Sequence, residues 1–192
     1  MSELPLIAVT DSATCPRPLA EQIERLAKLT ELRPQAVILR AKALDKAAYR
    51  TLALQAQPSC EAAGIPLILH SDWQLARELG ISMLHLPLAF LRQISEYERA
   101  YFTWLSTSVH SVGEAQEAQA LGATVLIAGH IYTTQCKAGL APRGLGFLQS
   151  VCSAVSLPVY AIGGIGFDAA QHAELKANGA RGACVMSAYM RL

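Results

Sequence analysis

The amino-acid sequence predicts an α/β protein whose eight parallel strands close into a (β/α)8 TIM barrel. Eight short apolar runs, each long enough for one strand, alternate with segments that show helical spacing or helix-capping residues. No linker or low-complexity tract divides residues 1–192, so we expect a single TIM-barrel domain. The chain is short for this fold, which requires lean loops. An open doubly wound sheet is the alternative architecture.

The individual elements follow from apolar runs, capping residues and glycine stops. The expected strands cover residues 6–10, 36–39, 66–70, 82–86, 103–109, 124–128, 158–162 and 183–186. The expected helices cover residues 19–30, 46–63, 72–79, 90–96, 112–121, 147–155 and 168–178. We expect Pro58 to break the second helix, and Ser111 and Gly122 to bound the fifth. The longest loop runs from Gly129 to Gly144.

Composition excludes several classes of protein. Hydrophobic residues make up 52% of the chain and charged residues 16%, with a formal net charge of +1. A nucleic-acid partner is not expected, because such proteins carry a strongly basic face. No apolar run reaches membrane-spanning length, so no membrane association is expected. The five cysteines form no CxxC pair, and the N-terminus resembles no signal peptide, which favours a cytoplasmic protein.

Polar residues gather just past the predicted strand ends, where barrels of this kind place their active sites. Histidines stand at or near four of these ends: His70, His85, His110 and His130. Their spacing includes no HxH or HxxxH pattern and the rim has few carboxylates, so we predict no metal site. We single out His130, which follows the sixth strand behind Gly129, as the candidate functional histidine of this rim.

Residues at two places on the same rim indicate anion binding. Gly163 and Gly164 follow the seventh strand, where phosphate-binding barrels bring backbone N–H groups to the anion. Ser187, one unit later, follows the eighth strand. Arg40 and Lys42 alternate at the end of the second strand, which directs both cations to one face. The sequence therefore predicts a site for a ligand with a phosphate group.

With these motifs in place, the chain resembles the thiamine phosphate synthase superfamily from Leu6 to its end. The motifs that carry the resemblance are 40–42 (Arg-Ala-Lys), 129–137 after the sixth strand, the Ala-Ile-Gly-Gly-Ile loop at 161–165, and the late Val-Met-Ser at 185–187. Together they cover most strand ends of the barrel, and the resemblance implies the same fold.

Departures from the pattern lead us to predict one branch of this superfamily. The synthases coordinate magnesium through an Asn-Asp pair after strand three and an aspartate after strand four. Here the first pair reads His70-Ser71, and Ala89 stands in the second region. Residues 129–144 are similar to the thiazole tautomerase, or TenI, branch, which isomerises a thiazole carboxylate phosphate in thiamine biosynthesis. The expected function is therefore a cofactor-free isomerase acting on a phosphorylated thiazole.

The resemblance also assigns roles to residues. His130 matches the catalytic histidine of the tautomerases, and His110 is the next candidate. The expected substrate contacts are Arg40, Lys42, His110, Thr134, Lys137, Gly163, Gly164, Met186 and Ser187. Two alternatives stay open: a divergent thiamine phosphate synthase, and a non-catalytic regulatory barrel that binds a phosphorylated ligand. A homodimer is also an open option.

Overall fold

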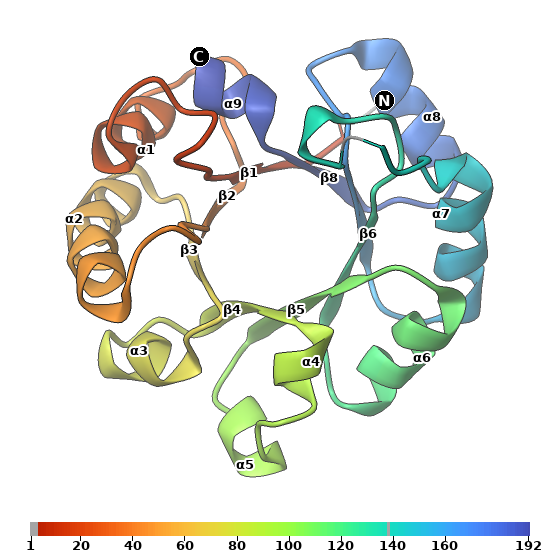
Figure 1. The fold of residues 1–192 in the computed structure, drawn as a ribbon, viewed down its shortest axis with the longest axis horizontal. Helices are drawn as coiled ribbons and strands as arrows, with labels where there is room; N and C mark the ends of the chain where they lie inside the picture. Colours follow the sequence, from red (N-terminus) through yellow and green to blue (C-terminus); the bar gives the residue numbers. More distant parts are fainter. Residues whose placement is uncertain (1–3, 138) are drawn as a thin grey trace.

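The computed structural model describes residues 4–137 and 139–192. They form a closed barrel of eight parallel strands in the order β1 to β8, with β8 pairing back onto β1. Figure 1 looks into the ring of strands and shows the helices packed around its outside. The predicted (β/α)8 TIM barrel is confirmed. None of the helices in the described ranges is both long enough and apolar enough to cross a bilayer.

The strands are short, with four to six residues each, and every one falls within two residues of its predicted bounds. They are β1 (Leu6–Val9), β2 (Ala36–Leu39), β3 (Leu67–His70), β4 (Met83–Pro87), β5 (Trp104–Val109), β6 (Val125–Gly129), β7 (Val159–Ile162) and β8 (Gly182–Val185). Alternate residues face the barrel interior or the helices because side chains alternate across a strand. The interior cluster includes Ile7, Ile38, Ile68, Ile127 and Cys184.

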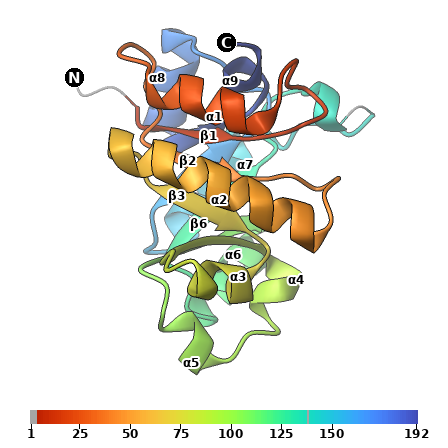
Figure 2. The ribbon, with the colours of Figure 1, turned by 90° about the vertical axis from the view of Figure 1, so that its left-hand side faces the viewer.

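The helices cover the outer faces of the strands with a larger apolar cluster. They are α1 (Leu19–Ala27), α2 (Lys46–Ala63), α3 (Trp73–Glu78), α4 (Leu88–Leu91), α5 (Glu96–Arg99), α6 (Val112–Ala120), α7 (Gly144–Ala154), α8 (Ala169–Ala177) and α9 (Ser187–Arg191), with a 3-10 turn η1 (Gln135–Lys137). Figure 2 shows the barrel from the side, with α1 and α2 in front and the loop that carries η1 projecting at one end.

Two helical predictions are wrong. The helix α2 runs without a break through Pro58, because this proline lies on the exposed face of the helix, where the carbonyl that loses its partner can meet water. The predicted helix at residues 90–96 is replaced by the two short helices α4 and α5. Ser95 caps α5 through a reciprocal pair with Glu98, which starts a new helix at the place where one was expected to end.

Candidate active site at the carboxyl ends of the strands

A cavity of about 920 Å³ opens at the carboxyl ends of the strands. Its volume lies near the upper end of the range for small-molecule sites. All ten predicted site residues line it: Arg40, Lys42, His110, His130, Thr134, Lys137, Gly163, Gly164, Met186 and Ser187. The barrel topology therefore brings together residues that are up to 147 positions apart in the chain. Their individual roles stay predictions.

The loop after β7 packs directly against the loop after β6. A Cβ on Gly163 would stand 2.2 Å from the His130 Cβ, and a Cβ on Gly164 would stand 2.5 Å from the Thr133 carbonyl oxygen. Both glycines also have positive φ angles, +104° and +69°, which other residues rarely adopt. Backbone hydrogen bonds from Ile131 and Tyr132 to the β7 end join the two loops. The glycine pair is thus required for loop packing, whatever ligand it meets.

Two side chains that are not among the ten predicted site residues hold these loops. The Arg143 Nε donates to the Gly129 carbonyl oxygen at 3.1 Å, and its guanidinium lies over the Phe147 ring. Gln171, on α8, donates from Nε2 to the Gly164 carbonyl oxygen at 3.0 Å and accepts from the Gly166 N–H at 2.9 Å. In the sequence, the only sign of these contacts is a long polar side chain in or just after each loop. Such a side chain does not by itself show which carbonyl group it reaches.

The two cations at the end of β2 differ in how firmly they are held. The Arg40 Nη1 donates to the Asp11 carboxylate at 2.5 Å, and the Thr14 hydroxyl donates to the same carboxylate. The Thr10 hydroxyl donates to the Arg40 carbonyl oxygen and accepts from the Arg40 backbone N–H. Arg40 is therefore fixed in position. Lys42 is exposed at the cavity edge and forms no ion pair with the described residues.

Two histidines lie at the mouth near β3 and β4 with their ring centroids 5.3 Å apart. His85 is buried between the hydroxyls of Ser106 and Ser108, at 3.0 and 3.1 Å from its two ring nitrogens. The His70 Nδ1 contacts the Ser71 hydroxyl at 2.6 Å. Burial is the main cause that lowers the pKa of His70 to about 4 and that of His85 to about 3. Both rings are therefore neutral at neutral pH.

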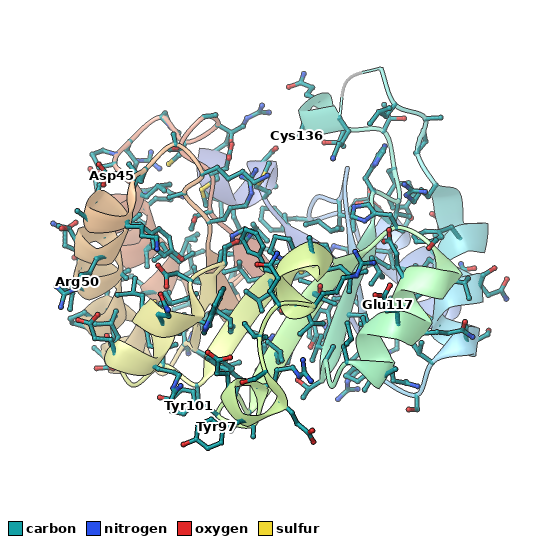
Figure 3. The ribbon with its side chains drawn as sticks, turned by 60° about the horizontal axis from the view of Figure 1, so that its bottom comes forward. Asp45, Arg50, Tyr97, Tyr101, Glu117 and Cys136 are labelled. Carbon is teal, nitrogen blue, oxygen red and sulfur yellow. The ribbon has the colours of Figure 1, made fainter. Side chains whose placement is uncertain are left out.

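Of the other two histidines of the cavity, His130 is half-buried and His110 is exposed. The His130 Nε2 lies 3.4 Å from the Leu140 carbonyl oxygen, on the long loop between β6 and α7. The His110 Nδ1 lies 3.3 Å from the Glu114 carboxylate, which also accepts the His110 backbone N–H at 2.6 Å. Figure 3 shows Cys136, on η1 of the same loop, standing above the rim of the barrel.

The electrostatic character of the cavity is cationic. Among the described residues, five lysines and arginines and four histidines line it, against one carboxylate, that of Glu114. The basic residues are Arg40, Lys42, Arg92, Lys137 and Arg191. No cluster of three or more His, Cys, Asp or Glu side chains suited to a metal ion occurs in the described ranges. The described lining of this α/β barrel site thus carries more basic than acidic side chains.

Comparison with known proteins places this barrel in a family. The family model described as thiamine monophosphate synthase matches residues 6–189. The thiamine-phosphate synthase of Herpetosiphon aurantiacus is 39% identical over 79% of this chain and 73% of its own length. That of Syntrophomonas wolfei is 30% identical over 98% of this chain and 90% of its own length. The chain belongs to the thiamine monophosphate synthase family.

The solved structures agree on the fold. The thiamine phosphate pyrophosphorylase from Pyrococcus furiosus matches with a TM-score of 0.78, covering 98% of this chain and 88% of that one. Because the sequence identity is only 23%, this match supports the fold alone.

The predicted isomerase function is wrong. Relatives that are 30–39% identical carry the name thiamine-phosphate synthase, and nothing among the comparisons points to the thiazole tautomerase branch. The prediction gave too much weight to three local departures, His130, Ser71 and Ala89, and too little to the rest of the chain. A change of ligand residues at one rim alters how a barrel holds its substrate without specifying a different reaction.

Proposed function

We propose that this protein is a thiamine-phosphate synthase, a transferase that joins a phosphorylated thiazole to a pyrimidine diphosphate. The observation that carries the proposal is the identity of 30–39% to curated synthases, which extends over 98% of the chain in one of them. The cationic cavity supports it, because both substrates are anions at neutral pH. The reaction involves no redox change, and the bond that forms needs no base.

The reaction is a substitution at carbon. The ring nitrogen of the thiazole forms a bond to the pyrimidine methylene carbon, while the bond from that carbon to the diphosphate oxygen breaks. The diphosphate leaves with the electron pair, so negative charge develops on its oxygen atoms. Fixed positive groups near the leaving oxygen stabilise this charge more strongly in the transition state than in the ground state.

The thiazole phosphate is assigned to the β7–β8 side of the cavity. Gly163 and Gly164 line the cavity there, and α9 begins at Ser187, directly after Met186. The first N–H groups of a helix have no partner within the helix and attract an anion. Thr134 and Lys137, on the long loop, face the same cavity and would contact the substrates from above.

The diphosphate is assigned to the β2–β5 side. Arg40 and Lys42 line the cavity at the end of β2, and His110 lines it at the end of β5. His130 lines the cavity at the end of β6, between these two sides of the rim. A substitution of this type needs no general base, so the role of His130 in the proposal is to position the loop and the substrates.

The test is synthesis of the product by the purified protein. With both substrates and Mg²⁺ present, thiamine phosphate and diphosphate should form in equal amounts, and omission of either substrate should abolish both products. Chromatography and a phosphate-release assay follow the two products independently. If each substrate binds but no thiamine phosphate forms, the chain is a ligand-binding barrel and the proposal fails.

A further inference from the structure

The side of the cavity near β3 and β4 lacks the side chains that a magnesium ion prefers. Mg²⁺ binds oxygen ligands, and its protein sites are built from carboxylates. The resemblance implies an Asn-Asp pair after β3 and an aspartate after β4, whereas this chain has His70-Ser71 and Ala89. The residues present therefore do not fit the family's metal site.

Carboxylates that follow strand ends of the barrel are already engaged. Asp72 caps α3 and accepts from the Leu75 N–H at 2.9 Å. Asp11 holds Arg40, and Glu114 accepts from His110 on the β5 side. Within the described lining, no carboxylate is left to face a cation beside His70.

Positive and hydrogen-bonding groups occupy this side in place of carboxylates. Arg40 is held by Asp11 through Nη1, and the remaining N–H groups of a guanidinium fork stay available to an anion. Lys42, which lines the same edge of the cavity, adds a second positive charge. An anion that enters here thus meets one fixed and one adaptable cation.

His70 adds a donor beside these cations. Its Nδ1 is engaged by the Ser71 hydroxyl, and its position at the end of β3 makes it part of the cavity lining. The Ser71 N–H donates to the His85 carbonyl oxygen at 2.9 Å, which fixes the turn that carries this hydroxyl. When the hydroxyl donates to Nδ1, the proton of the neutral ring lies on Nε2, free to serve an anion.

We infer that Arg40, Lys42 and His70 bind the diphosphate group directly, so that this chain needs no divalent cation to hold it. The inference rests on the proposed function for the identity of the anion. In place of a metal bridge, two side-chain cations and an imidazole N–H neutralise and orient the leaving group. Binding of inorganic pyrophosphate is the property that follows and that can be measured without turnover.

Anion binding should also draw a proton to His70. Burial first, and then Arg40 and Lys42, lower the pKa of His70 in the free protein. An anion offsets the two cations, so the pKa of His70 rises in the complex and binding takes up protons. The polar and charged groups around His70 are Arg40 and Lys42 after β2, Tyr49 on α2, Ser71 and Asp72 after β3, and His85 on β4.

The experiment is calorimetric titration of the protein with inorganic pyrophosphate, in EDTA and separately in Mg²⁺. We expect binding in EDTA that is at least as tight as in Mg²⁺ and strengthens from pH 7.5 to pH 6. The variants Lys42→Ala and His70→Asn should each weaken it about 10- to 100-fold, the range of a hydrogen bond to a charged group. The matched controls are Lys46→Ala on α2 and His172→Asn on α8, neither of which lines the cavity. Both should bind as the natural chain does.

Two results overturn the inference: pyrophosphate that binds only with Mg²⁺, and Lys42→Ala or His70→Asn that bind as tightly as their controls. The synthase assay, run with and without EDTA, separates this from the proposed function. Product that forms only with Mg²⁺ contradicts the inference and upholds the function. Metal-free binding without product in either buffer upholds the inference and contradicts the function.

Discussion

The two sides of the cavity are built by different means. On the β6–β7 side the backbone forms the surface, and the loops approach so closely that Gly163 and Gly164 leave no room for a Cβ. On the β2–β4 side, side chains form the surface: Arg40, Lys42 and His70 project into the cavity lining from three separate positions. The first side depends on shape and the second on charge.

The two sides therefore tolerate different substitutions. A surface made of backbone is disrupted by any added atom, because the opposing loop has to move as a unit. A surface made of exposed or half-buried side chains can exchange them one at a time. This explains how the chain keeps the glycine loop of its family while the positions after β3 and β4 hold different residues.

The largest expected effect comes from adding one methyl group to the backbone side. In Gly163→Ala the new Cβ would stand 2.2 Å from the His130 Cβ, at a φ of +104° that alanine rarely adopts. Overpacking costs about 1–3 kcal/mol, with the backbone conformation adding to it. We expect lower stability in urea unfolding and loss of most synthase activity, because the β6 loop is displaced.

The matched control for this change is Gly166→Ala. A Cβ on Gly166 meets nothing within 4 Å, and its φ lies outside the left-handed range. It should therefore keep both stability and activity. Equal behaviour of the two variants would contradict the close packing of the two loops.

The second effect is a fall in the free energy of unfolding at acid pH, caused by His70 and His85 on the β2–β4 side. The unfolded chain protonates its histidines near pH 6.5, whereas folding lowers the pKa of His70 to about 4 and that of His85 to about 3. Between these values the unfolded state binds more protons, so stability falls as pH falls. Each histidine contributes at most about 1.4 kcal/mol per pH unit.

Urea unfolding between pH 7 and pH 4.5 measures this slope. His70→Asn removes one of the two groups and should give a flatter dependence than the natural chain. An unchanged slope in His70→Asn would mean that His70 titrates normally in the folded protein.

A smaller effect is expected from the anchor of the long loop. Arg143→Ala removes the hydrogen bond to the Gly129 carbonyl oxygen and the contact with Phe147. A loss of about 1–2 kcal/mol in stability corresponds to one such hydrogen bond plus one cation–π contact. Urea unfolding measures it, and KM should rise more than kcat falls, because the loop loses its position over the substrates. A variant with natural stability and KM would remove Arg143 from this role.

The smallest effect is expected at Cys136. Its side chain is exposed on η1, above the rim in Figure 3, and the structure shows it in no disulfide. Cys136→Ser should leave kcat and KM for the synthase reaction unchanged. A large fall in kcat would assign a chemical role to the thiol that its exposure gives no reason to expect.

The barrel and the site position could be predicted from sequence because both depend on local patterns. Apolar runs specify the strands, and parallel strands in a barrel bring their carboxyl ends to one rim, so residues such as Arg40 and His130 had to meet there. The contacts of Arg143 and Gln171 could not be predicted, since each depends on where a long side chain reaches in three dimensions. The continuity of α2 through Pro58 depends likewise on which face is exposed.

The functional branch was the part that local patterns misjudged. His70, Ser71 and Ala89 differ from the magnesium ligands of the synthases, and on that difference alone the sequence predicts a change of reaction. The similarity over the whole chain points to the synthases. We infer instead that the same residues change only how the diphosphate is held.

A crystal structure with thiamine phosphate and pyrophosphate, grown in EDTA, tests the two-sided cavity most directly. We expect the phosphate group of thiamine phosphate to lie against Gly163, Gly164 and Ser187, and pyrophosphate to contact Arg40, Lys42 and His70. Ligands in the reverse arrangement, or pyrophosphate absent until a metal ion is added, would contradict it.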